Sequence, residues 1–277
     1  MIAAAAALLL AASPTPSATW LGPKPPPIPK RIATLAPSLT ETVIALGLGD
    51  RLVGVSRYDD LPEVAKLPRL GGLMDPSAEA VVGVKPDLVL AQPSPASAEV
   101  LRRLSELGLP ILELPMASIA DVLEAERTIG AALGAAGKGD ALAKALSTHL
   151  AETTDRMKGL PRPRVLLVYG WDPLVVAGPG SFADELLAAI GAENAAGAAK
   201  SAYATYSVEA AATSHPQVIV DATFDQPMPA LFKTLPGLST ARVVKPASLA
   251  LLHPGPSLSR GLDELAQAVH PELRPKP

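Results

Sequence analysis

The fold of this chain is decided by a stretch that occurs twice, as SAEAVVGVKPDLVL at residues 77–90 and as SVEAAATSHPQVIV at residues 207–220. In each copy a glutamate, Glu79 or Glu209, lies seven residues before a proline, and an apolar run follows the proline. This pattern predicts a short helix that stops at the proline and leads into a buried strand. Two copies at so long a spacing indicate two similar lobes rather than a solenoid of short repeats.

The similarity extends upstream of each copy. The strand-like runs RIATL at residues 31–35 and RVLLV at residues 164–168 are each followed by a serine and an amphipathic helix that a glycine closes. In the first half Ser38 and Glu41 have the spacing of a capping box, in which a hydroxyl and a carboxylate satisfy free amides at a helix start. We therefore predict that Ser38 caps the helix over residues 38–47.

Strand and helix signals alternate along both halves, which is typical of parallel sheets with crossover helices. We predict an α/β fold with two similar lobes, mainly parallel sheets and a single long connecting helix. The predicted strands lie at residues 31–35, 52–55, 87–91, 110–114, 164–169, 174–177, 217–221 and 242–245. The predicted helices lie at residues 38–47, 77–84, 97–107, 118–134, 139–158, 181–190, 207–213 and 257–269.

The helix predicted at residues 139–158 is long enough, at roughly 30 Å, to join the lobes as one stiff connection. Gly134 and Gly137 are expected to separate it from the helix before it. We divide the chain into a leader and tether, an N-terminal lobe, a connecting helix and a C-terminal lobe. These segments cover residues 1–30, 31–136, 137–160 and 161–277.

The N-terminal leader has an apolar run of eleven residues, Ile2 to Ala12, too short for a membrane span of ~20 residues. The run resembles the core of a secretory signal, although the usual basic residue after Met1 is missing. A disordered alanine-rich leader is the alternative interpretation. Residues 14–29 are predicted to be an extended proline-rich tether with no core of its own. We expect secretion to the periplasm.

Composition excludes several classes of protein. The 277 residues are 48% hydrophobic and 18% charged, as in a globular protein, and the net charge of −3 provides no basic surface for nucleic acid. The chain has no cysteine, which excludes disulfides, thiolate metal sites, a cysteine nucleophile and a lipid-anchor cysteine.

Enzyme and metal motifs are also missing. The sequence has no nucleophile elbow, no phosphate-binding Gly-x-x-x-x-Gly-Lys loop and no His-Glu-x-x-His pair. Its four histidines do not converge from both halves, so we predict no metal site. An α/β enzyme remains the remote alternative, because fold alone does not fix function.

An organic ligand held between the lobes by aromatic side chains is the interpretation that remains. Tyr58 and Trp171 each follow a predicted strand, where ligands of doubly wound sheets bind. Tyr203 and Tyr206 precede the second repeated helix. Aromatic faces suit a broad planar ligand, although the same rings could pack inside their own lobes.

Glu79 and Glu209 also have two interpretations. A carboxylate in the first turn of a helix is stabilised by the helix dipole by ~0.3–1 kcal/mol. Stabilisation by the helix dipole would explain either glutamate alone. Descent of both halves from one duplicated ancestor would explain why both have a glutamate there. A role in docking to a two-fold symmetric partner explains why both halves carry a glutamate at the same offset.

The order of motifs resembles the family of periplasmic vitamin B12-binding proteins, the substrate-binding components of ABC importers for cobalamin, haem and iron-siderophores. The resemblance covers residues 31 to 270. It rests on the stretches at residues 31–41, 49–58, 85–90, 178–182, 191–194 and 254–256.

This resemblance implies lobes joined by one rigid helix and one docking glutamate per lobe, which pairs with arginines of the dimeric permease. Glu79 and Glu209 match those two positions. Where the family has tryptophans on the ligand-facing side, this chain has Leu73 and Gln92, and Trp171 is a candidate replacement.

We therefore predict a monomeric periplasmic receptor, with no catalytic residues and no cofactor, that delivers cobalamin or a related corrinoid to an ABC permease. A ferric siderophore or haem receptor is the alternative, with His253 or Tyr58 as a haem ligand. The predicted ligand-binding residues are Pro37, Ser38, Tyr58, Gly72, Gln92, Trp171, Tyr203, Tyr206 and His253.

Overall fold

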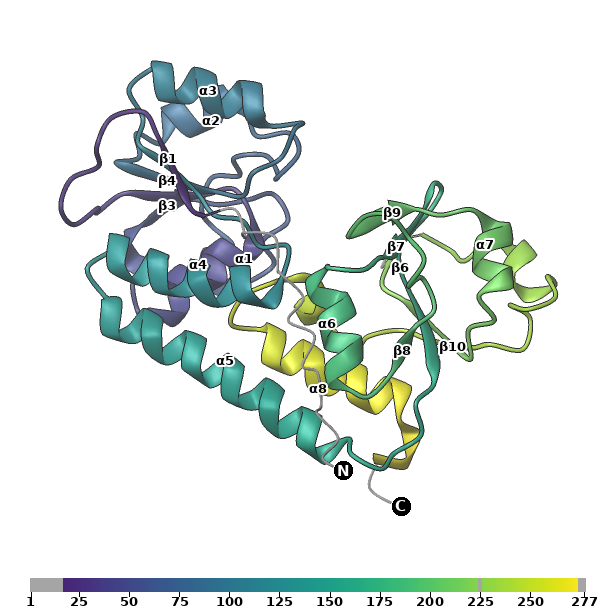
Figure 1. The fold of residues 1–277 in the computed structure, drawn as a ribbon. Helices are drawn as coiled ribbons and strands as arrows, with labels where there is room; N and C mark the ends of the chain where they lie inside the picture. Colours follow the sequence, from purple (N-terminus) through teal and green to yellow (C-terminus); the bar gives the residue numbers. More distant parts are fainter. Residues whose placement is uncertain (1–16, 224–225, 274–277) are drawn as a thin grey trace, which may run out of the picture.

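The computed structural model describes residues 17–223 and 226–273. Within these ranges the chain forms two α/β lobes side by side (Figure 1). Most of the predicted leader lies outside the described residues, so the secretory signal stays a prediction. No helix in the described ranges combines the length and the apolar character needed to cross a bilayer.

The N-terminal lobe is built on a five-stranded sheet in the order β1-β5-β4-β2-β3. β2 to β5 are parallel, as predicted, and β1 is antiparallel to β5. Helices α2 and α3 cover one face of the sheet and α1 and α4 the other (Figure 1). The elements are β1 (Thr19–Leu21), β2 (Ile32–Thr34), α1 (Pro37–Ala45), β3 (Leu52–Gly54), α2 (Ala78–Gly83), β4 (Leu88–Ala91), α3 (Ala98–Glu106), β5 (Ile111–Glu113) and α4 (Ile119–Ala132).

The C-terminal lobe has a six-stranded sheet in the order β11-β10-β6-β7-β9, and the short β8 pairs with β6. β11, β10, β6 and β8 are parallel, whereas β7 is antiparallel to both β6 and β9. The elements are β6 (Arg164–Trp171), β7 (Leu174–Ala177), α6 (Phe182–Ala189), β8 (Glu193–Asn194), β9 (Tyr203–Thr205), α7 (Val208–Thr213), β10 (Val218–Asp221), β11 (Arg242–Val244) and α8 (Leu258–Val269).

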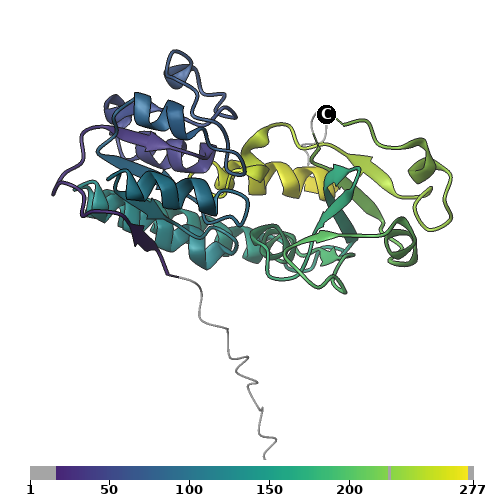
Figure 2. The ribbon, with the colours of Figure 1, turned by 90° about the horizontal axis from the view of Figure 1, so that it is seen from above.

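A single helix, α5 (Ala136–Arg156), joins the lobes. It packs against α4 of the N-terminal lobe and against α6 and α8 of the C-terminal lobe, and the lobes lie at its two ends (Figure 2). Gly134 ends α4 with a positive φ, whereas Gly137 lies inside α5, so the prediction of a break there was wrong. Helices α4 and α5 pack closely where Gly130 meets Gly139: a Cβ added to Gly130 would lie 2.8 Å from the Cα of Gly139.

The hydrophobic core is continuous from one lobe to the other. Side chains from one face of each sheet, such as Leu90 and Leu167, join α1, α4, α5, α6 and α8 in one buried cluster. The opposite face of each sheet has a separate core, around Val89 in the N-terminal lobe and Ile219 in the C-terminal lobe. The connection between the lobes is therefore a packed core as well as a helix.

Two further local predictions were wrong. Residues 19–21 of the predicted tether form β1, which pairs with β5 and so covers an otherwise unpaired sheet edge. Ser38 does not cap α1: Ala36 is the N-cap and Pro37 occupies the first turn, where its fixed φ suits a helix start. Glu41 is consequently free to point elsewhere, and its partner lies in the other lobe.

Candidate functional site

The lobes are joined by direct polar contacts, which we call the seam. The amide of Phe182, at the start of α6, donates to the carbonyl of Ala117 at 2.6 Å. The amide of Ile119, at the start of α4, donates to the Glu185 carboxylate at 3.0 Å. Amides at helix starts have no partner within their own helix, so each lobe here satisfies groups of the other.

A histidine–glutamate pair forms the third contact of the seam. His253 Nδ1 lies 2.7 Å from Glu41 Oε1, and the side chains are only 12% and 10% exposed. Next to this pair, a Cβ added to Gly255 would lie 3.1 Å from the Ser38 carbonyl oxygen. His253 was predicted to contact the ligand. The structure instead places one of its ring nitrogens against the other lobe.

Three predicted ligand-binding residues, Pro37, Ser38 and Gln92, lie on neighbouring segments of the N-terminal lobe. Gln92 follows β4 and donates from Nε2 to Ser38 Oγ at 2.8 Å. The same Nε2 lies 3.2 Å from the sulfur of Met116, a residue that sequence reasoning missed because no motif surrounds it. Pro37 is half-buried beside them. Ser38 and Met116 are only 2% and 4% exposed, so the half-buried amide of Gln92 is the more accessible polar group of the three.

A buried polar network lies behind this cluster. The hydroxyls of Thr34 and Thr40 are 2.6 Å apart, and Thr40 donates to Asp59 Oδ2 at 3.1 Å. Burial raises the pKa of Asp59 to about 6, against the opposing effects of its hydrogen bonds and of Arg69. The charge of Glu41 adds to the rise in the pKa of Asp59, so the network and the seam are electrostatically connected.

Tyr58 is the most accessible of the predicted aromatic residues, with 60% of its surface exposed. Its ring lies against Gly72, where an added Cβ would be 2.5 Å from Cε2. The guanidinium of Arg57 lies 5.7 Å from the ring centroid and is paired with Asp75. Gly72 therefore acts by leaving room for the ring, and Tyr58 remains free to present a flat apolar face.

The aromatic residues of the C-terminal lobe behave differently. Trp171 is only 5% exposed; its ring packs 4.7 Å from Phe232, and Nε1 donates to Asp221. Trp171 thus belongs to the core, and we leave it out of the ligand-binding set. Tyr203 is half exposed and stacks at 5.5 Å on Tyr169, while Tyr206 is half-buried.

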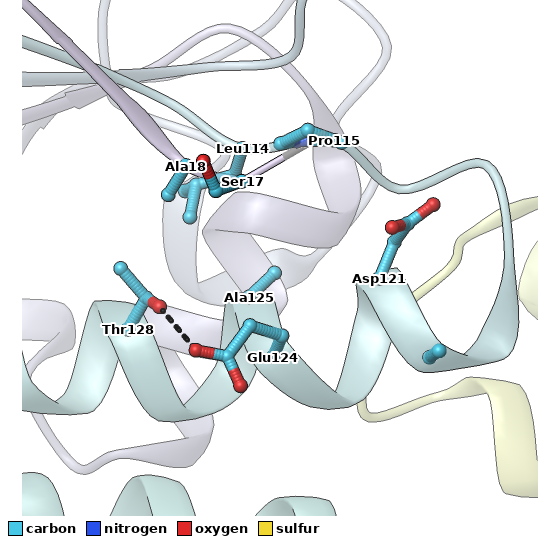
Figure 3. Close-up of a pocket in the computed structure, with 9 residues that line it drawn as sticks. Ser17, Ala18, Leu114, Pro115, Asp121, Glu124, Ala125 and Thr128 are labelled. Carbon is cyan, nitrogen blue, oxygen red and sulfur yellow. Dashed lines mark hydrogen bonds between the residues drawn. The ribbon is translucent and has the colours of Figure 1, made fainter. Parts of the chain in front are cut away.

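Two concavities lie within single lobes. One, of about 300 Å³, lies between the segment before β1 and helix α4, where Thr128 donates to Glu124 (Figure 3). The other, of about 460 Å³, lies beneath α7 and includes Tyr206 and Arg164. Only Tyr206 among the predicted ligand residues lines either one. The lining of the first is Ser17, Ala18, Leu114, Pro115, Ala120, Asp121, Glu124, Ala125 and Thr128.

The repeated helices α2 and α7 are built alike. Ser77 Oγ accepts from the amide of Ala80 at 3.3 Å, and Ser207 Oγ accepts from that of Ala210 at 3.0 Å. Along residues 77–86 and 207–216 the pattern of buried and exposed positions agrees everywhere except at the sixth residue. Both helices are followed by a non-glycine residue at positive φ, Lys85 at 47° and His215 at 45°.

Glu79 and Glu209 occupy the second position of these helices, and both are exposed. Among the described residues, neither carboxylate has an ion pair or hydrogen bond. Two unpaired carboxylates thus stand at matched positions, one on each lobe.

Comparison with known proteins decides the family. A family model described as periplasmic binding protein matches residues 32–246. The chain belongs to the periplasmic binding protein family. An uncharacterized ABC transporter substrate-binding lipoprotein, YvrC of Bacillus subtilis, is 34% identical over 258 residues, covering 88% of this chain and 81% of the relative. As a periplasmic binding protein of ABC transport, the chain is a carrier of a small molecule and not an enzyme.

Other members of the family have named ligands. The vitamin B12-binding protein of Salmonella choleraesuis is 30% identical over 191 residues, covering 69% of this chain and 71% of the relative. The structure of a periplasmic heme-binding protein from Pseudomonas aeruginosa superposes with a TM-score of 0.76 at 30% identity, covering 90% of this chain and 96% of that one. These likenesses confirm the predicted two-lobed α/β fold.

Proposed function

We propose that this periplasmic binding protein captures cobalamin or a related corrinoid between its lobes, in the periplasm and as a monomer, and delivers it to the permease of an ABC importer. Relatives named for vitamin B12 and for heme support a ligand of the corrinoid or haem kind, and a ferric siderophore is the remaining alternative. Physical features of the N-terminal lobe then favour a corrinoid.

The main observation in support of a corrinoid is that Arg57 and Arg69, the cationic side chains near Tyr58, already have partners within the protein. Arg57 is paired with Asp75, and Arg69 donates to the carbonyls of Ser56 and Asp59 at 3.2 and 3.0 Å. A ligand with several carboxylates would need free cations to compensate the loss of its hydration. A corrinoid carries uncharged amide side chains, which need hydrogen-bonding groups rather than cations, and the half-buried amide of Gln92 is one such group.

The exposed ring of Tyr58 supports the same proposal. Its flat face offers a large contact area at a low cost in side-chain entropy, which suits a planar macrocycle. Gly72 leaves room for the ring, because it has no side chain there, and Tyr203 offers a second, half-exposed ring on the other lobe.

Calorimetric titration of the purified protein with cyanocobalamin, with a visible spectrum recorded in parallel, tests the ligand. We expect heat and a shifted corrinoid band. Absence of both at roughly 100 μM ligand, where a receptor with a micromolar Kd is nearly saturated, would exclude a corrinoid. A tris-catecholate ferric complex, which is strongly anionic, serves as the comparison ligand and should not bind.

Haem is the second candidate, and one observation favours it. The hydroxyl of Tyr58 has no hydrogen bond to any residue that the structure describes, so its oxygen is available as an axial ligand. His253 is less suited, because its side chain is only 12% exposed, whereas Tyr58 is 60% exposed. Haemin that shifts its Soret band on addition to the wild type but not to Tyr58→Phe would select haem over a corrinoid.

Docking to the permease is assigned to Glu79 and Glu209. They are exposed, have no partner among the described side chains, and lie at the same position of two equivalent helices. Charge-assisted pairs between carboxylates and arginines are strong and geometrically specific. A partner with two-fold symmetry would meet the same local surface on each lobe.

A further inference from the structure

Arg31 and Arg164 lie at equivalent places in the two lobes, and the side chain of each reaches the end of α2 or α7. These two helices carry Glu79 and Glu209, and we call them the docking helices. Arg31, just before β2, donates from Nη2 to the Val84 carbonyl at 2.7 Å and from Nε to the Lys85 carbonyl at 2.9 Å. Arg164, the first residue of β6, donates from Nε to the Ser214 carbonyl at 3.0 Å. Val84 and Ser214 are the C-cap residues of α2 and α7. The two arginines therefore hold equivalent ends of equivalent helices.

The backbone of each arginine is held in the same way in both lobes. The amide of Arg31 donates to the carboxylate of Asp87 at 2.9 Å, and the amide of Arg164 donates to the side chain of Gln217 at 2.9 Å. Asp87 and Gln217 occupy the same position of the repeat, directly after its proline. Each arginine is thus fixed to the strand that its docking helix leads into.

These contacts are important because the docking helices are short. α2 and α7 have six residues each, far fewer than the ~12–15 at which an isolated helix becomes marginally stable in water. The last carbonyls of a helix have no partner within it, and a cation there also interacts favourably with the helix dipole. Serine caps hold the first turn, and the arginines hold the last.

We propose that Arg31 and Arg164 are positioning residues for docking: they fix the two helices on their sheets so that Glu79 and Glu209 meet a two-fold symmetric, cationic partner at the same time. This inference rests on the proposed docking role of the two glutamates. Two linked contacts strengthen each other only when their geometry allows both to form. A loosened helix end would therefore weaken docking while leaving Tyr58 and Gln92 unchanged.

The first test measures how well α2 and α7 are held in their helical conformation. Hydrogen exchange is measured on the full chain carrying Arg31→Gln or Arg164→Gln. We expect the amides of α2 to exchange about tenfold faster in Arg31→Gln while those of α7 keep their rate, with the reverse pattern in Arg164→Gln. Arg162→Gln is the matched control, because Arg162 is exposed, lies two residues before Arg164 and has no side-chain partner in the described structure. Unchanged exchange in both variants would overturn the proposal.

The second test measures docking. Immobilised protein is used to retain its permease from detergent-solubilised native membranes, with Glu79→Ala/Glu209→Ala as the reference for lost docking. We expect each arginine variant to weaken retention about tenfold, with part of it restored in Arg31→Lys, and ligand affinity to stay at the wild-type value. If the glutamate variant fails to dock but the arginine variants dock normally, the positioning role is wrong and the docking proposal survives. If the glutamate variant docks normally, both are wrong.

Discussion

The two repeated units, residues 77–90 and 207–220, are alike in capping, burial and backbone conformation, whereas the surroundings of the predicted ligand-binding residues differ between the two lobes. The N-terminal lobe has an exposed tyrosine over a glycine and a buried threonine–aspartate network. The C-terminal lobe places its tryptophan in the core and inserts an antiparallel hairpin, β6–β7, into its sheet.

This contrast agrees with the two tasks that we propose for the molecule, docking to a permease and binding a ligand. The parts that a symmetric partner would meet have stayed equivalent, while the parts that an asymmetric small molecule would meet have diverged. The following predictions test whether that division holds, beginning with the largest expected effect.

Removing both docking carboxylates, in Glu79→Ala/Glu209→Ala, should abolish uptake of labelled cyanocobalamin by cells that have only this variant, and each single change should impair it. Ligand affinity should stay within about threefold of wild type, or ~0.6 kcal/mol, because neither carboxylate has a hydrogen bond or ion pair with a predicted ligand-binding residue. Glu152→Ala, which removes an exposed glutamate from α5, is the control and should transport normally. Normal transport by the double variant would contradict the docking role.

The two predicted aromatic contacts should respond in opposite ways. Trp171→Ala removes a buried ring and leaves Asp221 without its indole donor, so it should cost about 3–5 kcal/mol of stability. Tyr58→Ala should change stability by less than about 0.5 kcal/mol but weaken ligand binding about tenfold. Urea unfolding and calorimetry measure the two effects. A stable Trp171→Ala variant with weakened binding would return Trp171 to the ligand site.

Buried acids provide a third contrast. Glu126 on α4 is 1% exposed and, among the described residues, both of its carboxylate oxygens are without a hydrogen bond, so burial raises its pKa to about 7. The buried Asp221 of the C-terminal lobe instead accepts from Trp171 and Thr223 and lies 3.4 Å from Lys245.

Because the pKa of Glu126 is higher in the folded state than its ordinary value of 4.5, its contribution to stability is present below pH 4.5 and is lost as the pH rises through about 7. Glu126→Gln should therefore raise the free energy of unfolding by about 2–3 kcal/mol at pH 8 and by little at pH 4.5. Urea unfolding at both pH values measures this, with Glu152→Gln as the exposed control. An equal effect at the two pH values would contradict a buried ionised Glu126.

The serine caps should give the smallest effect and the closest match between the lobes. Ser77→Ala and Ser207→Ala each remove one helix-start hydrogen bond, which is worth about 1 kcal/mol. Hydrogen exchange of α2 and α7 should report equal local losses to within a few tenths of a kcal/mol. Ser201→Ala, at an exposed serine outside both units, is the control. A loss in only one helix would show that the units are less equivalent than their structures.

Sequence periodicity was sufficient for most helices and strands, because the hydrophobic pattern and the glycine and proline stops are local signals. It was not sufficient for β1, β8 and β9, whose sequences TWL, EN and YAT contain no continuous apolar run that marks a strand. Their pairing partners, unlike their own residues, decide that they are strands.

The site was predictable to a smaller extent. Glu79 and Glu209 could be singled out because a repeat marks them. The Glu41–His253 contact joins residues 212 positions apart, and no motif near either residue predicts it. The sequence predicted a local capping role for Glu41, and that prediction was wrong. The burial of Trp171 likewise depends on contacts with Phe232 and Asp221. Both residues are distant in the sequence, so the local pattern around Trp171 could not predict them.

The continuous core has a consequence for how such proteins can be recombined. One face of each sheet packs into a single apolar core together with α1, α4, α5, α6 and α8. A lobe cut away at the connecting helix would therefore expose part of this core to water. The halves are duplicated in pattern but are not interchangeable modules, and we expect a single calorimetric transition rather than one for each lobe. A new ligand specificity must therefore be acquired by substitutions on the loops of an intact molecule, because exchanging a whole lobe would break the core that both halves share.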